Sequence, residues 1–559
     1  MSNKVLIVGG VAGGASTAAR LRRMDEQAEI VMFERGEYIS FANCGLPYYI
    51  GGAIENREEL LIQTPEAMKA RFNIDVRVKQ EVMSIDKDKK TIEVRKVDTD
   101  EIYTESYDDL VLSPGSSPLK PPIEGINRPN IFTLWNIPDV DKIKAYVEEH
   151  DLETATVIGG GFIGIEMAEN LHELGLSVAI AEMADQVMAP VDFDMAQILH
   201  NHMIRKSVKL HLSNGVKSFQ PNKVNDFATD VVLSDGTVIE SDIIILAIGI
   251  KPNGELAKNA GLDVNSRGGI IVDDYLRTSD KSIYALGDAI QVVDYINQVD
   301  TMIPLAGPAN KQGRIVANNI AGVDEKYNGT QGSSVAKVFD MTVANTGTNE
   351  KTLKRLGKVY NKDYKVAVVI SGSHAGYYPG ATSMFLKLIF DNEGKILGAQ
   401  GVGYDGVDKR IDIIATAIRF GGTIYDLKEL ELAYAPPYSS AKDPTNMLGY
   451  IAENILTGKM DAIIPSEIAD IDFDTQILLD VRTTEENRRA HIPNNVLIPV
   501  DELRDRMNEL DKSKEIIIYC AAGLRGYIAS NILKANGFKT KNLIGGFSYY
   551  SMWGTNLNS

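Results

Sequence analysis

The chain has 559 residues, enough for three or four domains, and its 44% hydrophobic and 24% charged residues are typical of globular proteins. A net charge of −18 argues against nucleic acid as a general partner, and two cysteines exclude a disulfide framework. The longest apolar run, residues 243–250, is too short to span a bilayer, so we expect a cytoplasmic protein that does not bind membranes.

The chain begins with the pattern of a dinucleotide-binding unit. An apolar strand at residues 5–8 leads into a glycine-rich turn at residues 9–14 and a helix to about Met24, and a second strand ends in Glu34. Glycines let the backbone approach a pyrophosphate at the helix N-terminus, and the acid binds a ribose hydroxyl. Because Val11 replaces the middle glycine of the usual pattern, an ordinary strand–helix turn is the alternative.

Residues 40–52 contain Cys44 and form the stretch around which we expect the chemistry to be organised. Gly45, Pro47, Gly51 and Gly52 break any long helix there. A free cysteine in isolation is more often a small buried hydrophobe than a reactive group. The neighbouring dinucleotide motifs favour a reactive Cys44.

The dinucleotide pattern recurs at residues 156–182. Its turn has all the expected glycines, at Gly159, Gly161 and Gly164, and its second strand ends in Glu182. A carboxylate at the ribose position repels a 2′-phosphate, so we expect NADH to be preferred over NADPH. Two such units in one chain are much more specific than one.

Further along the chain, apolar strands at residues 110–112 and 244–248 end in small-residue turns, and residues 283–289 end a strand in Gly287-Asp288. With these features the chain resembles the pyridine nucleotide-disulfide reductases, flavoproteins with two dinucleotide sites, over about residues 1–450. The resemblance implies that Asp288 binds the ribityl and phosphate part of FAD, with a helix N-cap as the alternative. Residues 325–450 match the family's interface domain, with alternating strands at 365–370 and 383–390, and imply a homodimer.

Residues 462–559 form a separate small α/β unit that resembles a rhodanese domain, on the motifs Asp-Val-Arg (480–482), His-Ile-Pro (491–493) and Cys-x-x-Gly-x-Arg (520–525). Cys520 lies at a strand-to-helix turn, where backbone N–H groups form an anion cradle and should lower a thiol pKa. The resemblance implies that Cys520 carries a persulfide sulfur beside Arg525. The alternative is an inactive module kept for binding.

One cysteine near a flavin restricts the chemistry, because Cys44 has no second cysteine nearby. It can cycle as a mixed disulfide with a small thiol, or as a sulfenic acid that reacts with peroxide or oxygen. Ser16, Arg20 and Arg23 form one stripe along the first helix, and paired arginines suit phosphates. A phosphate-bearing thiol points to coenzyme A, and a solvated charged face is the alternative.

The whole chain resembles a coenzyme A disulfide reductase fused to a rhodanese, the group that includes NADH-dependent persulfide and polysulfide reductases. The match rests on Ser-Phe-x-x-Cys-x-x-Pro-Tyr (40–48), on Val-Ala-Gly-Gly (11–14) and on the tail. Oxidase and peroxidase relatives carry a histidine near Ala12, and its absence here counts against sulfenic acid chemistry. We expect CoA persulfide, polysulfide or CoA disulfide as substrates. A water-forming NADH oxidase or peroxidase and a sulfur-delivery or sulfur-sensing protein are the alternatives.

The expected fold is α/β, with two Rossmann-like domains, an α+β dimerisation domain and an α/β rhodanese domain. The predicted boundaries are 1–120 and 251–324 for the two parts of the FAD domain, 121–250 for the NAD(P)H domain, 325–457 for dimerisation and 458–559 for rhodanese. No metal is expected.

The resemblance and the motifs together give the expected site residues. The expected catalytic residues are Cys44, Cys520, Arg525, Tyr434 and one of the adjacent pair Tyr377 and Tyr378, of which Tyr378 is the candidate. The expected FAD- and NAD(P)H-binding residues are Gly9, Gly10, Ala12, Gly13, Gly14, Glu34, Arg35, Asn43, Ser113, Pro114, Gly115, Gly159, Gly161, Phe162, Ile163, Gly164, Glu182, Gly249, Gly287, Asp288, Pro304, Leu305 and Ala306. The expected coenzyme A site comprises Ser16, Arg20, Arg23, Ser40, Asn43, Arg71, Asn310 and Lys442.

Overall fold

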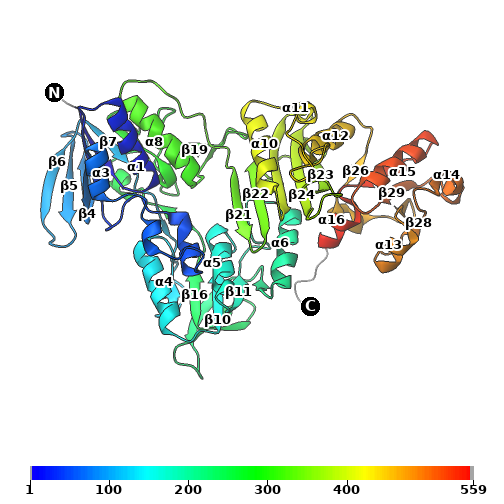
Figure 1. The fold of residues 1–559 in the computed structure, drawn as a ribbon, viewed down its shortest axis with the longest axis horizontal. Coiled ribbons are helices and arrows are strands. Elements are labelled where there is room, and N and C mark those ends of the chain that lie inside the picture. Colours follow the sequence, from blue (N-terminus) through cyan, green and yellow to red (C-terminus); the bar gives the residue numbers. More distant parts are fainter. Residues whose placement is uncertain (1–2, 554–559) are drawn as a thin grey trace. The chain divides into compact units, whose positions relative to one another are not determined.

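The computed structural model describes residues 3–553, which divide into two compact units (Figure 1). The first unit contains residues up to 184 together with 211–332, and the second contains 185–210 together with 333 onward. The segment 185–210 includes helix α6 (Phe193–Arg205). The sequence places this segment within the second dinucleotide domain, whereas in the structure it packs with the second unit.

The first unit contains the parallel sheet expected from the first glycine-rich motif. Its strand order is β18 (Ile283–Ala285), β7 (Asp109–Leu112), β1 (Lys4–Val8), β2 (Glu29–Glu34) and β3 (Asp75–Val78). Helices α1 (Ala12–Met24) and α8 (Ala306–Ile320) pack against each other beside this sheet (Figure 1). Leu6, Ile7 and Val111 are fully buried, as continuous apolar strands in a parallel sheet should be.

A second parallel sheet in this unit carries the second motif. Strands β11 (Ser177–Ala181), β10 (Thr154–Ile158), β16 (Ile243–Leu246) and β9 (Ile131–Phe132) are neighbours in that order. Helix α5 (Phe162–Glu173) follows β10 directly. The antiparallel strands β4 (Gln80–Asp86), β5 (Thr91–Lys96) and β6 (Ile102–Ser106) complete the first part of the unit. The two Rossmann-like sheets predicted from the sequence are therefore confirmed.

The second unit contains a five-stranded antiparallel sheet. Its order is β21 (Ser334–Val338), β22 (Met341–Gly347), β25 (Ile396–Gly403), β24 (Ser383–Asp391) and β23 (Tyr364–Gly372). Helices α10 (Val407–Arg419) and α12 (Pro444–Leu456) pack on it. The alternating stretches at 365–370 and 383–390 form the antiparallel pair β23 and β24, with β23 at the edge of the sheet, as expected for strands of an antiparallel sheet.

The tail of the second unit forms its own parallel sheet. The strand order is β26 (Ala462–Ile463), β30 (Thr540–Leu543), β29 (Glu515–Tyr519), β27 (Gln476–Asp480) and β28 (Val496–Leu497). Helix α15 (Leu524–Ala535) follows β29, and the last helix, α16 (Gly546–Trp553), packs on α6. The ring of Trp553 meets that of Phe193 at 5.4 Å between centroids.

A buried ion cluster lies in the second unit. The ammonium of Lys387, on β24, is fully buried and lies 2.7 Å from Asp194, 2.6 Å from Glu350 and 3.1 Å from Asp192. These carboxylates raise the pKa of Lys387 well above its usual value, against the effect of burial. Because Asp192 and Asp194 lie at the start of α6, the cluster connects α6 to the antiparallel sheet.

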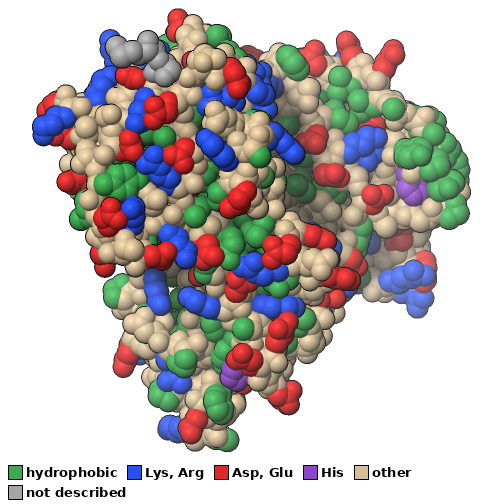
Figure 2. Space-filling model, turned by 60° about the vertical axis from the view of Figure 1, so that its left-hand side comes forward, with side chains coloured by type: hydrophobic (Ala, Val, Ile, Leu, Met, Phe, Trp, Pro, Cys, Tyr) green, Lys and Arg blue, Asp and Glu red, His purple; other side chains and the backbone are tan. Residues whose placement is uncertain are grey.

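Charged side chains of both signs are mixed on the face of the molecule that Figure 2 shows. On the face in Figure 2, Lys and Arg side chains alternate with Asp and Glu and do not gather into one basic patch. Within residues 3–553, no helix has the length and apolar character needed to cross a membrane. The same residues contain no cluster of three or more potential metal-binding side chains.

Candidate functional site

Cys44 lies in a short 3₁₀ helix, Asn43–Gly45, directly before α2 (Leu46–Ile50). Its thiol is exposed, and so is the neighbouring Asn43. A backbone hydrogen bond from Ala42 N–H to the Leu60 carbonyl oxygen (2.7 Å) fixes the chain segment just before the cysteine. Desolvation, with smaller contributions from Glu166 and Asp288, raises the pKa of the Cys44 thiol. In this environment Cys44 is less readily ionised than a free thiol.

The first glycine-rich turn forms a tight cradle before α1. Gly9 has a φ of +99°, and a Cβ there would lie 2.0 Å from the carbonyl oxygen of Ser113. Gly14 must also lack a side chain, because its Cβ would meet the Gly9 carbonyl oxygen at 1.9 Å. Glu34 accepts a hydrogen bond from Gly10 N–H (3.0 Å). Val11 has a φ of −92°, which any L-residue can adopt, so the missing middle glycine does not disturb the turn.

The second turn repeats this geometry before α5. Gly159 has a φ of +106° and a Cβ there would lie 2.3 Å from the Ala247 carbonyl oxygen. Glu182 accepts hydrogen bonds from Gly160 N–H (2.7 Å) and Ala184 N–H (2.8 Å). In each unit, the glutamate that ends or follows the second strand (Glu34 or Glu182) thus accepts a hydrogen bond from a backbone N–H group of the glycine-rich turn.

Both turns fit a bound dinucleotide. The N-terminal residues of α1 and α5 have no side-chain cap, so their first backbone N–H groups are available to an anion. A Cβ added at Gly161 would meet no atom within 4 Å, which leaves space in front of α5. These cradles suit the pyrophosphates of FAD and of a nicotinamide dinucleotide.

Asp288 lies in the 3₁₀ turn Gly287–Ala289, which follows β18. Its carboxylate accepts a hydrogen bond from the Ser116 hydroxyl at 3.0 Å, and burial raises its pKa. The remaining predicted FAD- and NAD(P)H-binding residues lie at strand ends and helix starts. Ser113, Pro114 and Gly115 follow β7, Gly249 follows β16, Arg35 follows β2, Phe162 and Ile163 begin α5, and Pro304, Leu305 and Ala306 lead into α8.

The predicted arginine stripe on α1 faces α8. The Ser16 hydroxyl bonds to the Asn310 side chain, and Arg20 Nε donates to Asn318 Oδ1 at 2.9 Å. Arg23 is exposed. Ser16 and Asn310, proposed from separate parts of the sequence, therefore meet, and Asn318 is an additional polar neighbour that the sequence did not indicate.

The other predicted coenzyme A residues are less closely connected. Arg71 is exposed on α3 (Pro65–Phe72), and Ser40 has a φ of +45° just before the Cys44 stretch. Lys442 is exposed in the second unit. Within the first unit, the structure brings Ser16 and Asn310 together, on the side of α1 from which Arg20 bonds to α8.

Two residues to which the sequence analysis gave no role in the site, Tyr48 and Glu166, lie near Cys44. The Tyr48 hydroxyl, from α2, bonds to the carboxyl group of Glu166 on α5. Burial, with a smaller contribution from Glu169, raises the pKa of Glu166 to about 7. The available signal was the position of Glu166, two residues after the last glycine of the second motif, on the turn of α5 nearest the cradle.

The second unit brings two tyrosine hydroxyls together. Tyr377 and Tyr434 are exposed, and their hydroxyl oxygens lie 2.7 Å apart. Tyr378 instead sets its ring against His374, with the centroids 5.6 Å apart. Between the two adjacent tyrosines, the geometry favours Tyr377 as the partner of Tyr434.

Cys520 lies in the turn between β29 and α15, as predicted. Its side chain is buried, and its Sγ accepts a hydrogen bond from Gly523 N–H at 3.1 Å. Gly523 has a φ of +110°, a conformation that favours glycine. The guanidinium of Arg525 donates to both oxygens of Glu486, at 2.7 and 2.6 Å. Glu486 was not singled out from the sequence.

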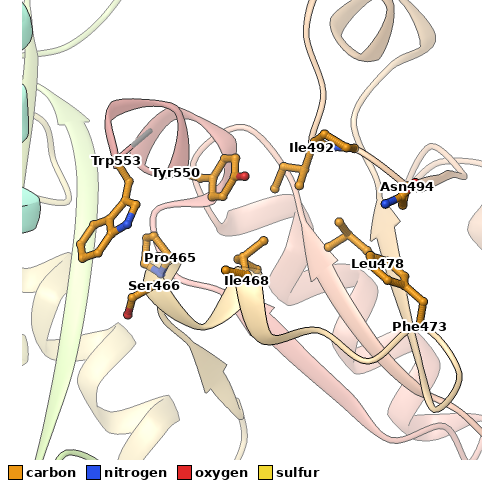
Figure 3. Close-up of a pocket in the computed structure, with 11 residues that line it drawn as sticks. Pro465, Ser466, Ile468, Phe473, Leu478, Ile492, Asn494, Tyr550 and Trp553 are labelled. Carbon is orange, nitrogen blue, oxygen red and sulfur yellow. The ribbon is translucent and has the colours of Figure 1, made fainter. Parts of the chain in front are cut away.

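A cavity of about 270 Å³ lies in the tail domain (Figure 3). Neither Cys520 nor Arg525 lines it. Figure 3 shows mainly apolar side chains around it. The cavity is lined by Pro465, Ser466, Ile468, Ala469, Phe473, Leu478, Ile492, Pro493, Asn494, Tyr550 and Trp553.

Three protein-family models match the chain in succession. They are pyridine nucleotide-disulphide oxidoreductase at residues 3–313, the dimerisation domain of that family at 333–444, and a rhodanese-like domain at 465–552. Together they cover both dinucleotide cradles, the antiparallel sheet and, except for β26, the tail sheet.

Solved structures and curated proteins give the same assignment. Reduced Bacillus anthracis CoADR-RHD is 53% identical with a TM-score of 0.96, covering 99% of this chain and 98% of that one. An NAD-dependent persulfide reductase from A. fulgidus is 38% identical with a TM-score of 0.90, covering 98% and 100%. The coenzyme A disulfide reductase of Staphylococcus aureus (strain JH9) is 36% identical over 454 residues, covering 80% of this chain and all of its own.

Proposed function

This chain belongs to the pyridine nucleotide-disulphide oxidoreductase family, and we propose that it uses NADH and FAD to reduce coenzyme A persulfide, polysulfide and coenzyme A disulfide. The observation that carries the proposal is an exposed, single cysteine, Cys44, in the unit that holds both dinucleotide cradles. The rhodanese-like domain and the similarity to a persulfide reductase support sulfane sulfur as the substrate class.

Cys44 cycles as a mixed disulfide with coenzyme A. When bound, FAD supplies the electron pair, taken from NADH, that breaks this disulfide. The freed Cys44 thiolate attacks the inner sulfur of a coenzyme A persulfide, the S–S bond breaks, and hydrosulfide leaves as the mixed disulfide forms again. With coenzyme A disulfide the leaving group is a coenzyme A thiolate.

Residues of α1 and α8 hold the coenzyme A substrate. Arg20 and the exposed Arg23 bind its phosphates, since guanidinium groups accept phosphate bidentately. Ser16 and Asn310, joined by a hydrogen bond, orient the chain of the ligand on the same face. Asn43, Ser40, Arg71 and Lys442 complete the proposed site.

The dimerisation domain implies a homodimer, and the partner subunit supplies the tyrosine pair to Cys44. One hydroxyl of the pair Tyr377–Tyr434 protonates the leaving sulfur. Two hydroxyls in contact allow one to donate its proton while the other stabilises the resulting oxyanion. The protein acts in the cytoplasm in this proposal.

Cys520 collects sulfane sulfur and passes it to coenzyme A. Its thiolate attacks the outer sulfur of a donor, which releases the rest of the donor as a thiolate and leaves a persulfide on Cys520. A coenzyme A thiolate then takes that outer sulfur and regenerates the Cys520 thiolate. The coenzyme A persulfide formed is the substrate for Cys44.

Single substitutions test this division of labour in anaerobic NADH-oxidation assays. Cys44→Ser should abolish turnover of every persulfide and disulfide, while Cys520→Ser should spare coenzyme A persulfide and reduce turnover of polysulfide. If Cys520→Ser leaves all sulfur substrates unaffected, the relay is wrong. If Cys44→Ser retains turnover, the reductase mechanism is wrong.

A further inference from the structure

The positive charge beside Cys520, which is that of Arg525, is already paired with the carboxylate of Glu486. Ala521, Ala522 and Gly523 connect Cys520 to α15, which begins with Leu524 and Arg525, so Arg525 is the charged residue of the stretch 520–525. It lies close enough to Cys520 for a thiolate there to raise the pKa of Arg525, although the larger contribution comes from Glu486. An anion that approaches the Cys520 sulfur therefore meets Arg525 as part of an ion pair.

The ion pair is bidentate and ionised at physiological pH. Two parallel bonds of 2.7 and 2.6 Å join the guanidinium to both carboxylate oxygens. Glu486 also caps its own helix, α13 (Thr484–Arg489), by accepting from Thr483 N–H (2.9 Å) and the Thr483 hydroxyl (3.0 Å). The hydrogen bonds from Arg525 are the largest cause of a lowered pKa at Glu486, and the bonds from Thr483 add to it, so that this pKa falls to about 2. Releasing Arg525 to a ligand requires breaking a bidentate, charge-assisted contact.

We propose that Glu486 makes Cys520 selective for organic hydropersulfides over sulfur oxyanions such as thiosulfate, by holding Arg525 in this pair. The inference rests on the proposed function, in which Cys520 collects sulfane sulfur. It names the donor class of that site, and it makes Glu486 a positioning residue.

The two donor classes differ in the charge of the leaving group that they release at the Cys520 loop. An organic hydropersulfide gives its outer sulfur to the Cys520 thiolate and releases one thiolate, a single charge that the loop N–H groups can accept. Thiosulfate enters as a dianion and releases sulfite, also a dianion, so its transfer from water to the loop needs an uncommitted cation. With Arg525 paired, the net charge of the Arg525–Glu486 pair is zero, and that cation is missing.

The test uses the full-length protein without NADH and measures thiocyanate formation from cyanide, with Cys520→Ser as the blank. Wild-type kcat/KM for glutathione persulfide should exceed that for thiosulfate by about 100-fold, the scale of a charge-based discrimination. Glu486→Gln should raise kcat/KM for thiosulfate about tenfold, mainly through KM, and so reduce the donor ratio. Glu486→Asp, which keeps the charge, should keep the ratio.

Two further variants test whether the freed charge of Arg525 is the cause of the higher kcat/KM for thiosulfate. Glu485→Gln removes the same charge one residue away, where Glu485 pairs with Arg488 and Arg489, and should leave the donor ratio as in wild type. Adding Arg525→Met to Glu486→Gln should remove the gain with thiosulfate, because the freed cation is then absent.

A wild-type donor ratio near one would overturn the inference, and so would a Glu486→Gln protein with an unchanged ratio. If Glu486→Gln fails to fold, the wild-type ratio and the single Arg525→Met variant decide. The proposal is contradicted if the Arg525→Met protein has the same kcat/KM for thiosulfate as for the persulfide. These results are independent of the relay, which fails only if NADH-coupled turnover does not need Cys520.

Discussion

The hydroxyl groups of Tyr377 and Tyr434 lie 2.7 Å apart on segments 57 residues apart in the chain. The hydrogen bond to Tyr377 is the main cause of a raised pKa at Tyr434. Both rings are exposed in the isolated chain. The pair is therefore available to another molecule, which in our account is the partner subunit with its bound substrate.

Replacing Tyr434 with Phe should lower kcat with coenzyme A persulfide by about 10²-fold, the usual contribution of a general acid. KM should change much less, because the ring that packs against the substrate remains. The matched control is Tyr438→Phe, since Tyr438 is an exposed tyrosine of the same loop. Steady-state NADH oxidation measures both variants, and equal kcat values for Tyr434→Phe and wild type would exclude proton donation by this residue.

Glu182 should determine the choice between NADH and NADPH. Its carboxylate is held by Gly160 N–H and Ala184 N–H, in the position where a 2′-phosphate would experience charge repulsion. We expect kcat/KM for NADH to exceed that for NADPH at least about tenfold, and Glu182→Ala to narrow this ratio. Glu173→Ala, at the exposed end of α5, is the control. A wild-type preference for NADPH would contradict the assignment.

Removing the Lys387 ammonium should destabilise the second unit strongly. Lys387→Met would leave Asp192, Asp194 and Glu350 buried without their shared cation, a change that typically costs about 3–5 kcal/mol. Trp553 lies in this unit and Trp135 in the other, so a Trp135→Phe background makes fluorescence report on the second unit alone. The urea midpoint of that signal should fall for Lys387→Met and stay constant for the exposed Lys395→Met.

Glu166 should influence the ionisation of Cys44. After desolvation, the charge of Glu166 is the next cause of the raised Cys44 pKa. Removing that charge stabilises the thiolate, so Glu166→Gln should shift the pH profile of Cys44 alkylation by iodoacetamide, measured on the protein after reduction has freed the thiol, to lower pH. The rate at neutral pH should rise accordingly. Glu173→Gln serves as the control, and an unchanged or upward-shifted profile for Glu166→Gln would contradict the field effect.

The regular parts of the fold were predictable because they depend on local patterns. The two strand–turn–helix units are encoded by apolar runs and by glycines whose Cβ atoms would collide with the backbone, as at Gly9 and Gly159. The strand-to-helix turn at Cys520 follows from the same kind of pattern.

Features that depend on distant packing were not predictable. Residues 185–210 join the second unit because Asp192 and Asp194 meet Lys387, which follows almost 200 residues later. Glu166 and Tyr48 meet because α2 packs on α5, and no periodicity in either helix indicates this contact. The choice between Tyr377 and Tyr378 depended on the direction of each ring, which a pair of adjacent identical residues does not reveal.

The central claim is that Cys44 is carried as a mixed disulfide with coenzyme A. The most direct test is the intact mass of the purified, non-reduced protein before and after dithiothreitol, with peptide mapping of the adduct. We predict an adduct of coenzyme A mass on Cys44 that reduction removes and that Cys44→Ser lacks. An unmodified Cys44, or one carrying a single additional oxygen, would contradict the claim and favour peroxide or oxygen chemistry.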